Sequence, residues 1–355
     1  MQTREDIIRI HDPNDVGVKG SFLGLPFTPE NAQMVIIPVP WDVTVSYSEG
    51  TAQGPQAVLD ASTQIDLFVK DIPEAWKLGI AFLPISEEIR QQSKEARKDA
   101  AAYISWLEEG QQNDGLSTLE AIPERINIAT QKLNEWVSQE ANLWLEKGKM
   151  VALLGGDHST PLGLINTLAD KHKNIGILQI DAHLDLRKAY EGFEHSHASI
   201  MYNALQNPHI TKLVQVGARD FCQDEIAFAV QTQGRVSIFY DQDIKEQQME
   251  GKTWQTICIN IVNQLPELVY ISFDIDGLDP KLCPNTGTPV AGGLEFHEAV
   301  YLIKTLVKAG KKIIGFDLNE VTPGEDEWDA NVGARLLYRM ANLMAVSQGK
   351  LKLIE

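Results

Sequence analysis

The chain has 355 residues, and 43% of them are hydrophobic, so it is long enough to bury a sizeable core in one α/β domain with insertions. Its net charge of −18 and isoelectric point of about 4.9 argue against nucleic acid as a partner, because phosphate binding needs a basic surface. The sequence has no run of about 18 apolar residues, so we expect no membrane-spanning segment and no membrane partner.

Short apolar runs alternate with helical patterns along the chain. Most of these runs are apolar throughout, which is typical of strands covered on both faces. We predict eight strands, at residues 34–40, 78–83, 150–156, 175–181, 212–218, 236–240, 268–276 and 312–320. Helical patterns between or after them include residues 55–66, 160–172, 296–310 and 334–346. This alternation predicts an α/β fold with three layers, α-β-α, around a mainly parallel eight-stranded sheet, in a single domain of residues 1–355.

One segment interrupts the alternation. Residues 84–149 separate two strands by about 66 residues, far more than one crossover helix needs. Within this segment, residues 93–112 and 126–149 both have a helical pattern. The second has one apolar stripe, formed by Leu133, Trp136, Val137, Ala141, Trp144 and Leu145. We predict a helical insertion that packs on the domain core or, as an alternative, on a neighbouring subunit.

Carboxylates and imidazoles follow three of the predicted strands. In "ILQIDAHLDLR" (177–187) an apolar strand ends in three such residues at alternate positions, which point the same way in extended chain. The ends of strands 150–156 and 268–276 carry similar residues. Parallel strands bring their carboxyl ends to one edge of the sheet, and unpaired buried carboxylates cost several kcal/mol, so cations must compensate them. The candidate metal ligands at these three strand ends are Asp157, His158, Asp181, His183, Asp185, Asp274 and Asp276.

These ligand types limit the choice of metal. Aspartate with histidine and no cysteine suits Mn²⁺, Fe²⁺, Co²⁺, Ni²⁺ or Zn²⁺, and a carboxylate-rich set favours manganese. We expect two divalent ions, Mn²⁺ with Ni²⁺ or Co²⁺ as alternatives, sharing a water whose lowered pKa gives a hydroxide nucleophile. Each segment alone also has a structural reading, with Asp157 or Ser159 as a helix N-cap and residues 274–280 as a turn. The coincidence of three segments favours the metal site.

The three segments also resemble a known family. "GGDHS" (155–159), "DAHLDLR" (181–187) and "SFDIDGLDP" (272–280) resemble, in order and spacing, the signature motifs of the ureohydrolases, which include arginase, agmatinase and formimidoylglutamase. Residues 38–58, 285–299 and 315–323 are similar to further segments of that family. The resemblance covers about residues 34–345, with the helical insertion outside it.

The resemblance implies an arginase-like fold and a dinuclear site. His158, Asp181, Asp185 and Asp274 would bind one metal; Asp181, His183, Asp274 and Asp276 would bind the other; Asp181 and Asp274 would bridge. It also implies the reaction, in which the bridging hydroxide attacks a guanidinium carbon and releases urea and an amine. With formimidoyl substrates the product is formamide.

Two further residues gain roles from the resemblance. Glu320 aligns with the glutamate that pairs with the substrate guanidinium, a charge that favours planar bidentate contacts. His197 aligns with the histidine that shuttles protons, a task suited to a neutral-range pKa, and His195 is its rival. We therefore expect Asp181, His197 and Glu320 to be catalytic residues, with Glu320, His197 and Glu191 binding the substrate.

The substrate follows less directly. Residues 185–199 are more similar to agmatinases than to arginases, and Glu191 and Glu194 could attract a distal ammonium group. We predict an agmatinase-like hydrolase acting on a small cationic guanidino compound. Free guanidine, guanidinobutyrate, guanidinopropionate, formiminoglutamate and arginine remain alternatives. Trp41, Asp42 and Asn319 match no one specificity.

Two other classes of protein compete with this prediction. Deacetylases share the fold with a single Zn²⁺, but the intact "DAHLD" argues against them. A non-catalytic metal-binding family member would usually lack a ligand, whereas all six are present. The resemblance implies a homo-oligomer, a trimer or hexamer. Three cysteines without a CxxC pair and a first segment without a signal peptide predict a cytoplasmic protein.

Overall fold

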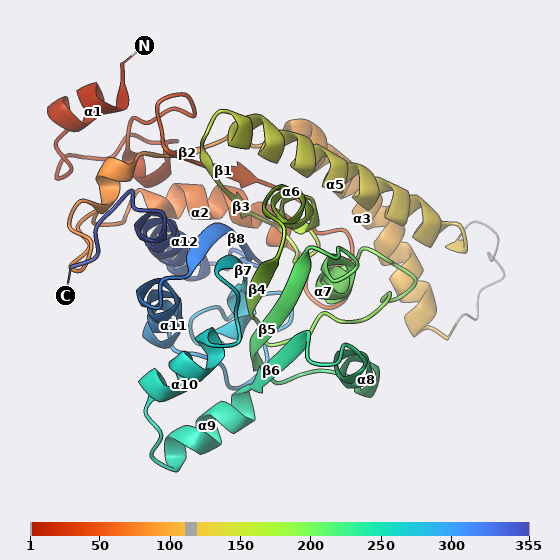
Figure 1. Ribbon diagram of the computed structural model, residues 1–355. Coiled ribbons are helices and arrows are strands. Elements are labelled where there is room, and N and C mark those ends of the chain that lie inside the picture. The colour runs from red at the N-terminus through yellow and green to blue at the C-terminus, as the bar shows by residue number, and fades with distance from the viewer. Residues whose placement is uncertain (1, 111–118, 355) are drawn as a thin grey trace.

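One parallel sheet forms the centre of the molecule. The structure, a computed structural model, describes residues 2–110 and 119–354, so the last two residues of the helix expected at 93–112 lie outside the described residues. The eight strands lie in the order β2-β1-β3-β8-β7-β4-β5-β6, and every neighbouring pair is parallel (Figure 1). Their bounds are β1 Met34–Pro38, β2 Ile80–Phe82, β3 Met150–Leu154, β4 Ile175–Ile180, β5 Ile210–Ala218, β6 Val236–Tyr240, β7 Leu268–Asp274 and β8 Lys312–Asn319. The predicted α-β-α fold is confirmed, although several strands end one or two residues earlier than expected.

Helices cover both faces of this sheet (Figure 1). One face packs against α1 Arg4–Ile10, α2 Gly54–Ser62, α9 Asp241–Met249, α10 Trp254–Val262, α11 Phe296–Lys308 and α12 Trp328–Ser347. The other face packs against α3 Glu87–Glu108, α5 Ile122–Glu146, α6 Leu162–His172, α7 Ile200–Ala204 and α8 Gln223–Gln231. Within the described residues, no helix combines the length and the apolar character that crossing a bilayer requires.

The segment expected to be a helical insertion belongs to the second of these layers. The apolar stripe predicted for residues 126–149 is found on α5, where Leu133, Val137 and Ala141 are fully buried. This face of α5 contacts α6, β1 and β3. At Gly163 of α6 a Cβ atom would lie 2.3 Å from the Asn134 carbonyl oxygen, so the glycine permits the close approach of the two helices. The helix pair therefore packs on the domain core.

The order of the strands gathers the motif segments. β3, β8, β7 and β4 are neighbours in the middle of the sheet, although β3 and β4 follow one another in the chain and β7 and β8 come much later. Each of these four strands ends in, or is closely followed by, a candidate site residue: His158 after β3, Asp181 after β4, Asp274 at the end of β7 and Glu320 after β8. Since all four strands are parallel, their carboxyl ends meet at one edge, where ligands bind in sheets of this kind.

Trp41 and Asp42, which the sequence alone does not explain, help to shape this edge. The Trp41 carbonyl accepts a hydrogen bond from the Asp157 backbone at 2.8 Å. A Cβ atom at Gly156 would lie 1.9 Å from the same carbonyl oxygen, so only glycine fits there. The Asp42 carboxylate accepts backbone hydrogen bonds from Gly50 and Ala52 at 3.1 and 3.2 Å. Trp41 thus holds the segment after β1 against the "GGDHS" turn, and Asp42 fixes the loop that follows within that segment.

An ion-pair network ties the segment after α2 to the helices on the same face. The Asp71 carboxylate accepts hydrogen bonds from Arg339 Nη1 at 2.9 Å and from Lys304 Nζ at 2.7 Å. Burial alone would raise the pKa of Asp71, but the hydrogen bonds and charges of Arg339 and Lys304 outweigh it and lower the pKa to about 2. Ionised Asp71 therefore stabilises the folded state.

We expect Asp71→Asn to lower the free energy of unfolding by about 1 kcal/mol at pH 7, a value discounted for solvent screening of this partly exposed group. Because the folded pKa lies below the unfolded one, the difference should be complete above about pH 4 and should fall as the pH approaches 2. Urea unfolding of the metal-depleted protein at several pH values measures this. Asp66→Asn is the control, and an Asp71→Asn effect that is independent of pH would contradict the assignment.

Candidate metal centre

The candidate ligands from three strand ends converge on His158. Its Nδ1 atom lies 3.0 Å from Asp181 Oδ2, 3.0 Å from Asp185 Oδ2 and 3.3 Å from Asp274 Oδ2. All four side chains are buried or nearly so. His158, Asp181 and Asp185 form one group whose ligand atoms all lie within 4.8 Å of one another.

A second group lies beside the first and shares Asp181. His183 Nδ1 is 3.1 Å from Asp276 Oδ2 and 3.5 Å from Asp181 Oδ1. Asp181, His183 and Asp276 again have ligand atoms within 4.8 Å of one another. The two oxygens of Asp181 therefore face two different groups of ligands. The structure thus brings together all six residues proposed as ligands, around two adjacent positions.

The donor set fits divalent cations. His158 Nδ1 is buried and has no hydrogen-bond partner of suitable geometry among the described residues, although three carboxylate oxygens lie within 3.3 Å of it. Four aspartates and two histidines without cysteine are ligands for a cation of intermediate hardness. A cation among these atoms would satisfy the imidazole nitrogen and offset the repulsion between the carboxylates.

The pKa shifts of the ligand side chains also indicate that the cluster binds cations. Burial, and then the charge of Asp181, raises the pKa of Asp185 to about 7. Burial, with Asp276 and Asp181 nearby, raises the pKa of Asp274 well above its usual value. Burial would lower the pKa of both His158 and His183, but the surrounding aspartates raise it well above the usual value. Protons and cations therefore compete for these ligands, and metal binding should strengthen as the pH rises.

The ring of His158 is oriented from behind by residues that the sequence analysis missed. Its Nε2 atom lies 2.9 Å from Ser272 Oγ, and Ser272 donates to Asp317 Oδ1 at 3.1 Å. Asn319 also donates to Asp317 Oδ1, which explains this residue as part of the support. The available signal was position: Ser272 and Asp317 are register partners on β7 and β8, and Ser272 lies two residues before Asp274. A serine–aspartate chain of this kind fixes the tautomer of a ligating histidine.

Two site residues have a left-handed backbone. Asp185 has φ of 54° and Glu320 has φ of 62°, a region that non-glycine residues seldom adopt. The Asp185 carbonyl accepts hydrogen bonds from the backbone of Met201 and Tyr202 at 3.1 and 3.2 Å. The Glu320 backbone N–H donates to the Gly156 carbonyl at 2.8 Å, and its carbonyl accepts from Thr286 Oγ1. Surrounding contacts therefore hold both residues in strained conformations that aim their side chains at the site.

Glu320 and His197 both lie close to the ligands. The Glu320 carboxylate accepts a hydrogen bond from the His158 backbone at 2.8 Å, and burial, followed by the charges of Asp274 and Asp157, raises its pKa well above the usual value. The partly buried His197 lines the cavity at the metal cluster, with its Nδ1 3.5 Å from Thr44 Oγ1. Burial, and then the charges of His183 and His158, lowers its pKa to about 4, below the neutral range expected from the sequence. His197 is therefore neutral at pH 7.

A cavity of about 150 Å³ opens beside the cluster. It contains His183 and Asp185 and reaches outward to a rim of polar and aromatic residues. The remaining lining residues are Ser46, Arg187, Tyr190, His197, Ala198, Asp220, Phe221, Glu225 and Thr288. The Arg187 guanidinium lies over the Tyr190 ring at 4.8 Å and 3.9 Å from Glu225, so its charge is partly neutralised.

Glu191, Glu194 and His195 do not line this cavity. The Glu191 side chain lies near Glu108 and Arg97 of α3; burial, and then Glu108, raises its pKa. The structure therefore does not bring Glu191 together with the other site residues. Asp220, which follows β5, lines the rim instead, and within the described part of the chain it has no cationic partner within 4.0 Å.

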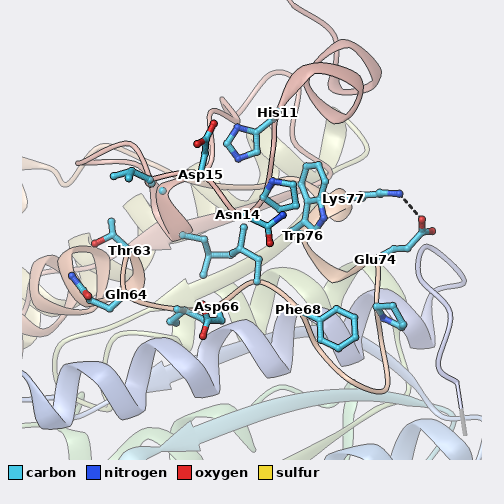
Figure 2. Close-up of a pocket in the computed structure, with 18 residues that line it drawn as sticks. His11, Asn14, Asp15, Thr63, Gln64, Asp66, Phe68, Glu74, Trp76 and Lys77 are labelled. Atoms are coloured by element: carbon cyan, nitrogen blue, oxygen red, sulfur yellow. Dashed lines mark hydrogen bonds and ion pairs between the residues drawn. The ribbon is translucent and has the colours of Figure 1, made fainter.

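A larger cavity lies elsewhere. It has a volume of about 1180 Å³ and is formed by the segments around His11, Asp66 and Trp76 (Figure 2). Figure 2 shows Lys77 paired with Glu74 at its edge. Neither of the two metal-ligand groups found among the described residues includes any residue of this cavity. Size alone therefore does not identify the functional site.

Comparison with known proteins assigns this chain to a family. The sequence profile described as the arginase family matches residues 32–342. The chain belongs to the arginase family. The ureohydrolase resemblance found in its motifs is thereby confirmed, and the matched region includes every residue of the metal cluster.

Relatives within the arginase family are similar over nearly the whole chain. The N(1)-aminopropylagmatine ureohydrolase of Thermus thermophilus is 30% identical over 320 residues, which cover 90% of this chain and 93% of the relative. The agmatinase of Neisseria meningitidis is 30% identical over 336 residues, 92% of this chain and 93% of the relative. The solved structure of the agmatine ureohydrolase of Thermoplasma volcanium has a similar fold, with a TM-score of 0.69, 20% identity, and coverage of 98% of this chain and 99% of that one.

The shared position of Asp181 predicts unequal effects of two ligand variants. Asp181→Ala should abolish binding of both metal ions, whereas Asp276→Ala should abolish one and retain the other. For each ion that is lost, the binding affinity should fall by more than roughly 10–100-fold, the effect that is typical of replacing a residue that only supports a metal ligand. Metal stoichiometry after equilibrium dialysis against Mn²⁺ measures this. Asp279→Ala, on the turn after the cluster, is the control; retention of both ions by Asp181→Ala would refute the shared ligand.

Proposed function

We propose that this protein is a dinuclear metal-dependent hydrolase of a guanidino compound with an amine tail, releasing urea and an amine. The observation that carries the proposal is the pair of ligand groups that share Asp181 at the carboxyl ends of β3, β4 and β7. Membership of the arginase family, and relatives described as agmatinase and N(1)-aminopropylagmatine ureohydrolase, support it.

Two divalent ions are the proposed cofactor. His158, Asp181, Asp185 and Asp274 would hold one, and Asp181, His183, Asp274 and Asp276 the other. The carboxylate-rich donor set favours Mn²⁺, with Ni²⁺ or Co²⁺ as alternatives. When bound, such ions lower the pKa of a shared water and supply a nucleophile at neutral pH.

Glu320 is proposed to bind the guanidinium group. Its Oε1 is held by the His158 backbone, and its other oxygen lies near Gly287, where a Cβ atom would come within 3.2 Å of it. The glycine therefore leaves room beside the carboxylate for a planar group. Although burial raises the pKa of Glu320, a bound guanidinium would restore its ionised form, because a buried cation and carboxylate stabilise each other.

His197 is proposed to move a proton to the leaving amine. Expulsion of the amine breaks the bond between carbon and nitrogen, and the departing nitrogen needs a proton that the attacking water gives up. His197 is neutral at pH 7, lines the cavity and is anchored through Thr44, whose Oγ1 accepts from its backbone at 3.2 Å. Its position in the cavity suits a group that delivers a proton there, and a pKa below the neutral range makes its protonated form a strong acid toward the leaving amine.

Asp220 is proposed to bind the distal ammonium of the substrate. It lies on the rim of the cavity, and its carboxylate is exposed with no cationic partner within 4.0 Å among the described residues. An amine tail that extends from the guanidinium position toward the rim would meet this charge. Agmatine and its aminopropyl derivative both carry such a tail.

Further properties belong to the same proposal. We expect a single-domain protein in which residues 84–149 are a helical insertion, because strands from residue 34 to residue 319 join one sheet. We also expect a homo-oligomer, a trimer or hexamer, located in the cytoplasm. The three free cysteines fit a reducing compartment.

The proposal is tested by urea release from purified protein loaded separately with Mn²⁺, Ni²⁺, Co²⁺ and Zn²⁺. The substrates are agmatine, aminopropylagmatine, arginine, guanidinobutyrate, guanidinopropionate and free guanidine, with formamide release from formiminoglutamate beside them. We expect an amine-tailed substrate to be preferred by a factor of about 100, which is about 2.7 kcal/mol of transition-state discrimination. Preference for a carboxylate-tailed substrate would refute the assignment of the tail.

Glu320→Gln should lower kcat/KM by roughly 100-fold, because the guanidinium loses its charged partner, while metal content stays near that of the unaltered protein. Steady-state kinetics with metal analysis of the same samples measures both. The exposed Glu325→Gln is the control. Loss of metal from Glu320→Gln would instead make this residue part of the metal site.

Asp220→Asn should raise KM for agmatine by roughly 2–5-fold, since an exposed ion pair contributes up to about 1 kcal/mol. The KM for butylguanidine, which has the same four-carbon chain but no ammonium, should be unaffected by the change. Asp224→Asn, exposed and outside the cavity, is the control. An equal effect on both substrates would show that Asp220 does not read the tail.

A further inference from the structure

Two glutamines lie behind the metal cluster, in an otherwise apolar layer. Gln179 on β4 and Gln215 on β5 are register partners on neighbouring strands and are 0% and 1% exposed. The residues two positions before them on the same face, Ile177 and Leu213, belong to the hydrophobic core of that face. Buried amides are costly unless hydrogen-bonded, so this pair requires a reason.

The pair forms one continuous chain of hydrogen bonds to the metal ligands. Gln215 Nε2 donates to the Leu184 carbonyl at 2.6 Å and to Gln179 Oε1 at 2.7 Å. Gln179 Nε2 then donates to Asp181 Oδ2 at 2.7 Å. Leu184 lies between the proposed ligands His183 and Asp185, so the chain contacts the ligand segment at two points.

The direction of these bonds follows from their ends. A backbone carbonyl only accepts, so Gln215 must present its NH₂ group to Leu184. Because this NH₂ group also donates to Gln179, the Gln179 side chain must present its oxygen to Gln215. The NH₂ group of Gln179 is then left to donate to Asp181. The buried Oε1 of Gln215 has no hydrogen-bond partner among the described residues. The pair therefore directs its donors at the ligand segment and leaves one buried acceptor without a hydrogen bond. Such exceptions to the rule that buried polar groups are paired are expected at functional sites.

The consequence for Asp181 is asymmetric. Its Oδ1 faces His183 and accepts a hydrogen bond from the His183 backbone N–H at 2.6 Å. This donor belongs to the backbone, so replacing a side chain does not remove it. Its Oδ2, which faces His158 at 3.0 Å, receives its donor from a side chain, Gln179. The carbonyl held by Gln215 belongs to the peptide that leads into Asp185, whose φ of 54° needs support. Both points of contact therefore serve the ligand group of His158, Asp181 and Asp185.

We propose that Gln179 and Gln215 are positioning residues that fix the Asp181 carboxylate and the Leu184–Asp185 peptide, and so set metal affinity at the His158 position selectively. This inference rests on the proposed dinuclear function. The two residues act through Asp181 and Asp185 and do not contact the substrate cavity.

The test measures metal binding without substrate. Gln179→Leu and Gln215→Leu are compared with Ile177→Val, a buried change on the same strand and face that does not touch the ligands. Equilibrium dialysis against Mn²⁺ gives the two dissociation constants, and electron paramagnetic resonance distinguishes a spin-coupled pair from a single ion. We expect one dissociation constant to rise 10–100-fold in each glutamine variant, with the other within about 3-fold. An uncoupled Mn²⁺ signal should appear at subsaturating metal, and the double variant should be little weaker than either single one.

Ligand variants then assign the position. In an Asp276→Ala background, which retains the His158 position, Gln179→Leu should weaken the remaining ion 10–100-fold; in an Asp185→Ala background it should change affinity by less than about 3-fold. Equal loss at both positions, or no loss, would overturn the proposal. Gln179→Met, closer in shape to glutamine, replaces Gln179→Leu if the latter fails to fold. Unaltered protein that binds two ions but releases no urea would refute the proposed hydrolysis alone; binding of fewer than two ions would overturn both.

Discussion

The mutual repulsion of four buried aspartates is the constraint on which the site depends. Asp181, Asp185, Asp274 and Asp276 are at most 5% exposed and share one edge of the sheet with the imidazoles of His158 and His183. Such a cluster raises the free energy of the folded protein unless cations occupy it. The fold therefore has to hold these charges together without help from their own interactions. It does so with the most rigid element available, four adjacent parallel strands whose register is fixed by hydrogen bonds along their length.

Several local features follow from this requirement. Arg219 illustrates them: its backbone donates to the Ala182 carbonyl at 2.8 Å, and its guanidinium donates to the Asp276 carbonyl at 2.7 Å. It thus joins two ligand segments through their backbones and adds no ion pair to a ligand carboxylate. Ser272, between His158 and Asp317, and the amides of Gln179 and Gln215 behind Asp181 act in the same way. Neutral donors orient the ligands while leaving their charge available for metal ions.

The residues of the outer part of the cavity are positioned differently from the ligands. The ligands lie at strand ends, whereas the rim residues Tyr190 and Asp220 lie on connecting segments that the sheet does not position directly. Such segments vary while the scaffold stays the same, which is how one family serves several guanidino compounds. Helix α3 supports this outer part, because its Arg97 donates to the carbonyl of Val45, which precedes the lining residue Ser46. The outer part of the cavity is therefore shaped by connecting segments and by a helix that supports them.

The sequence by itself determined the strand pattern, the α/β architecture and the six metal-ligand candidates. These are local properties: apolar runs define strands, and aspartates and histidines directly after them mark candidate ligands. The expected reason for their convergence was wrong, because β4 ends at Ile180 and the left-handed backbone of Asp185, not strand alternation, turns that side chain toward the site. Only the tertiary structure decided which distant residues complete the site. Ser272, Asp317, Gln179 and Gln215 look like ordinary strand residues until strand order and register place them behind the ligands. The acidic residue of the rim shows the same limit. Glu191 and Asp220 are equally plausible as charges in the sequence, but the left-handed turn at Glu191 and its packing toward α3 leave Asp220 at the cavity.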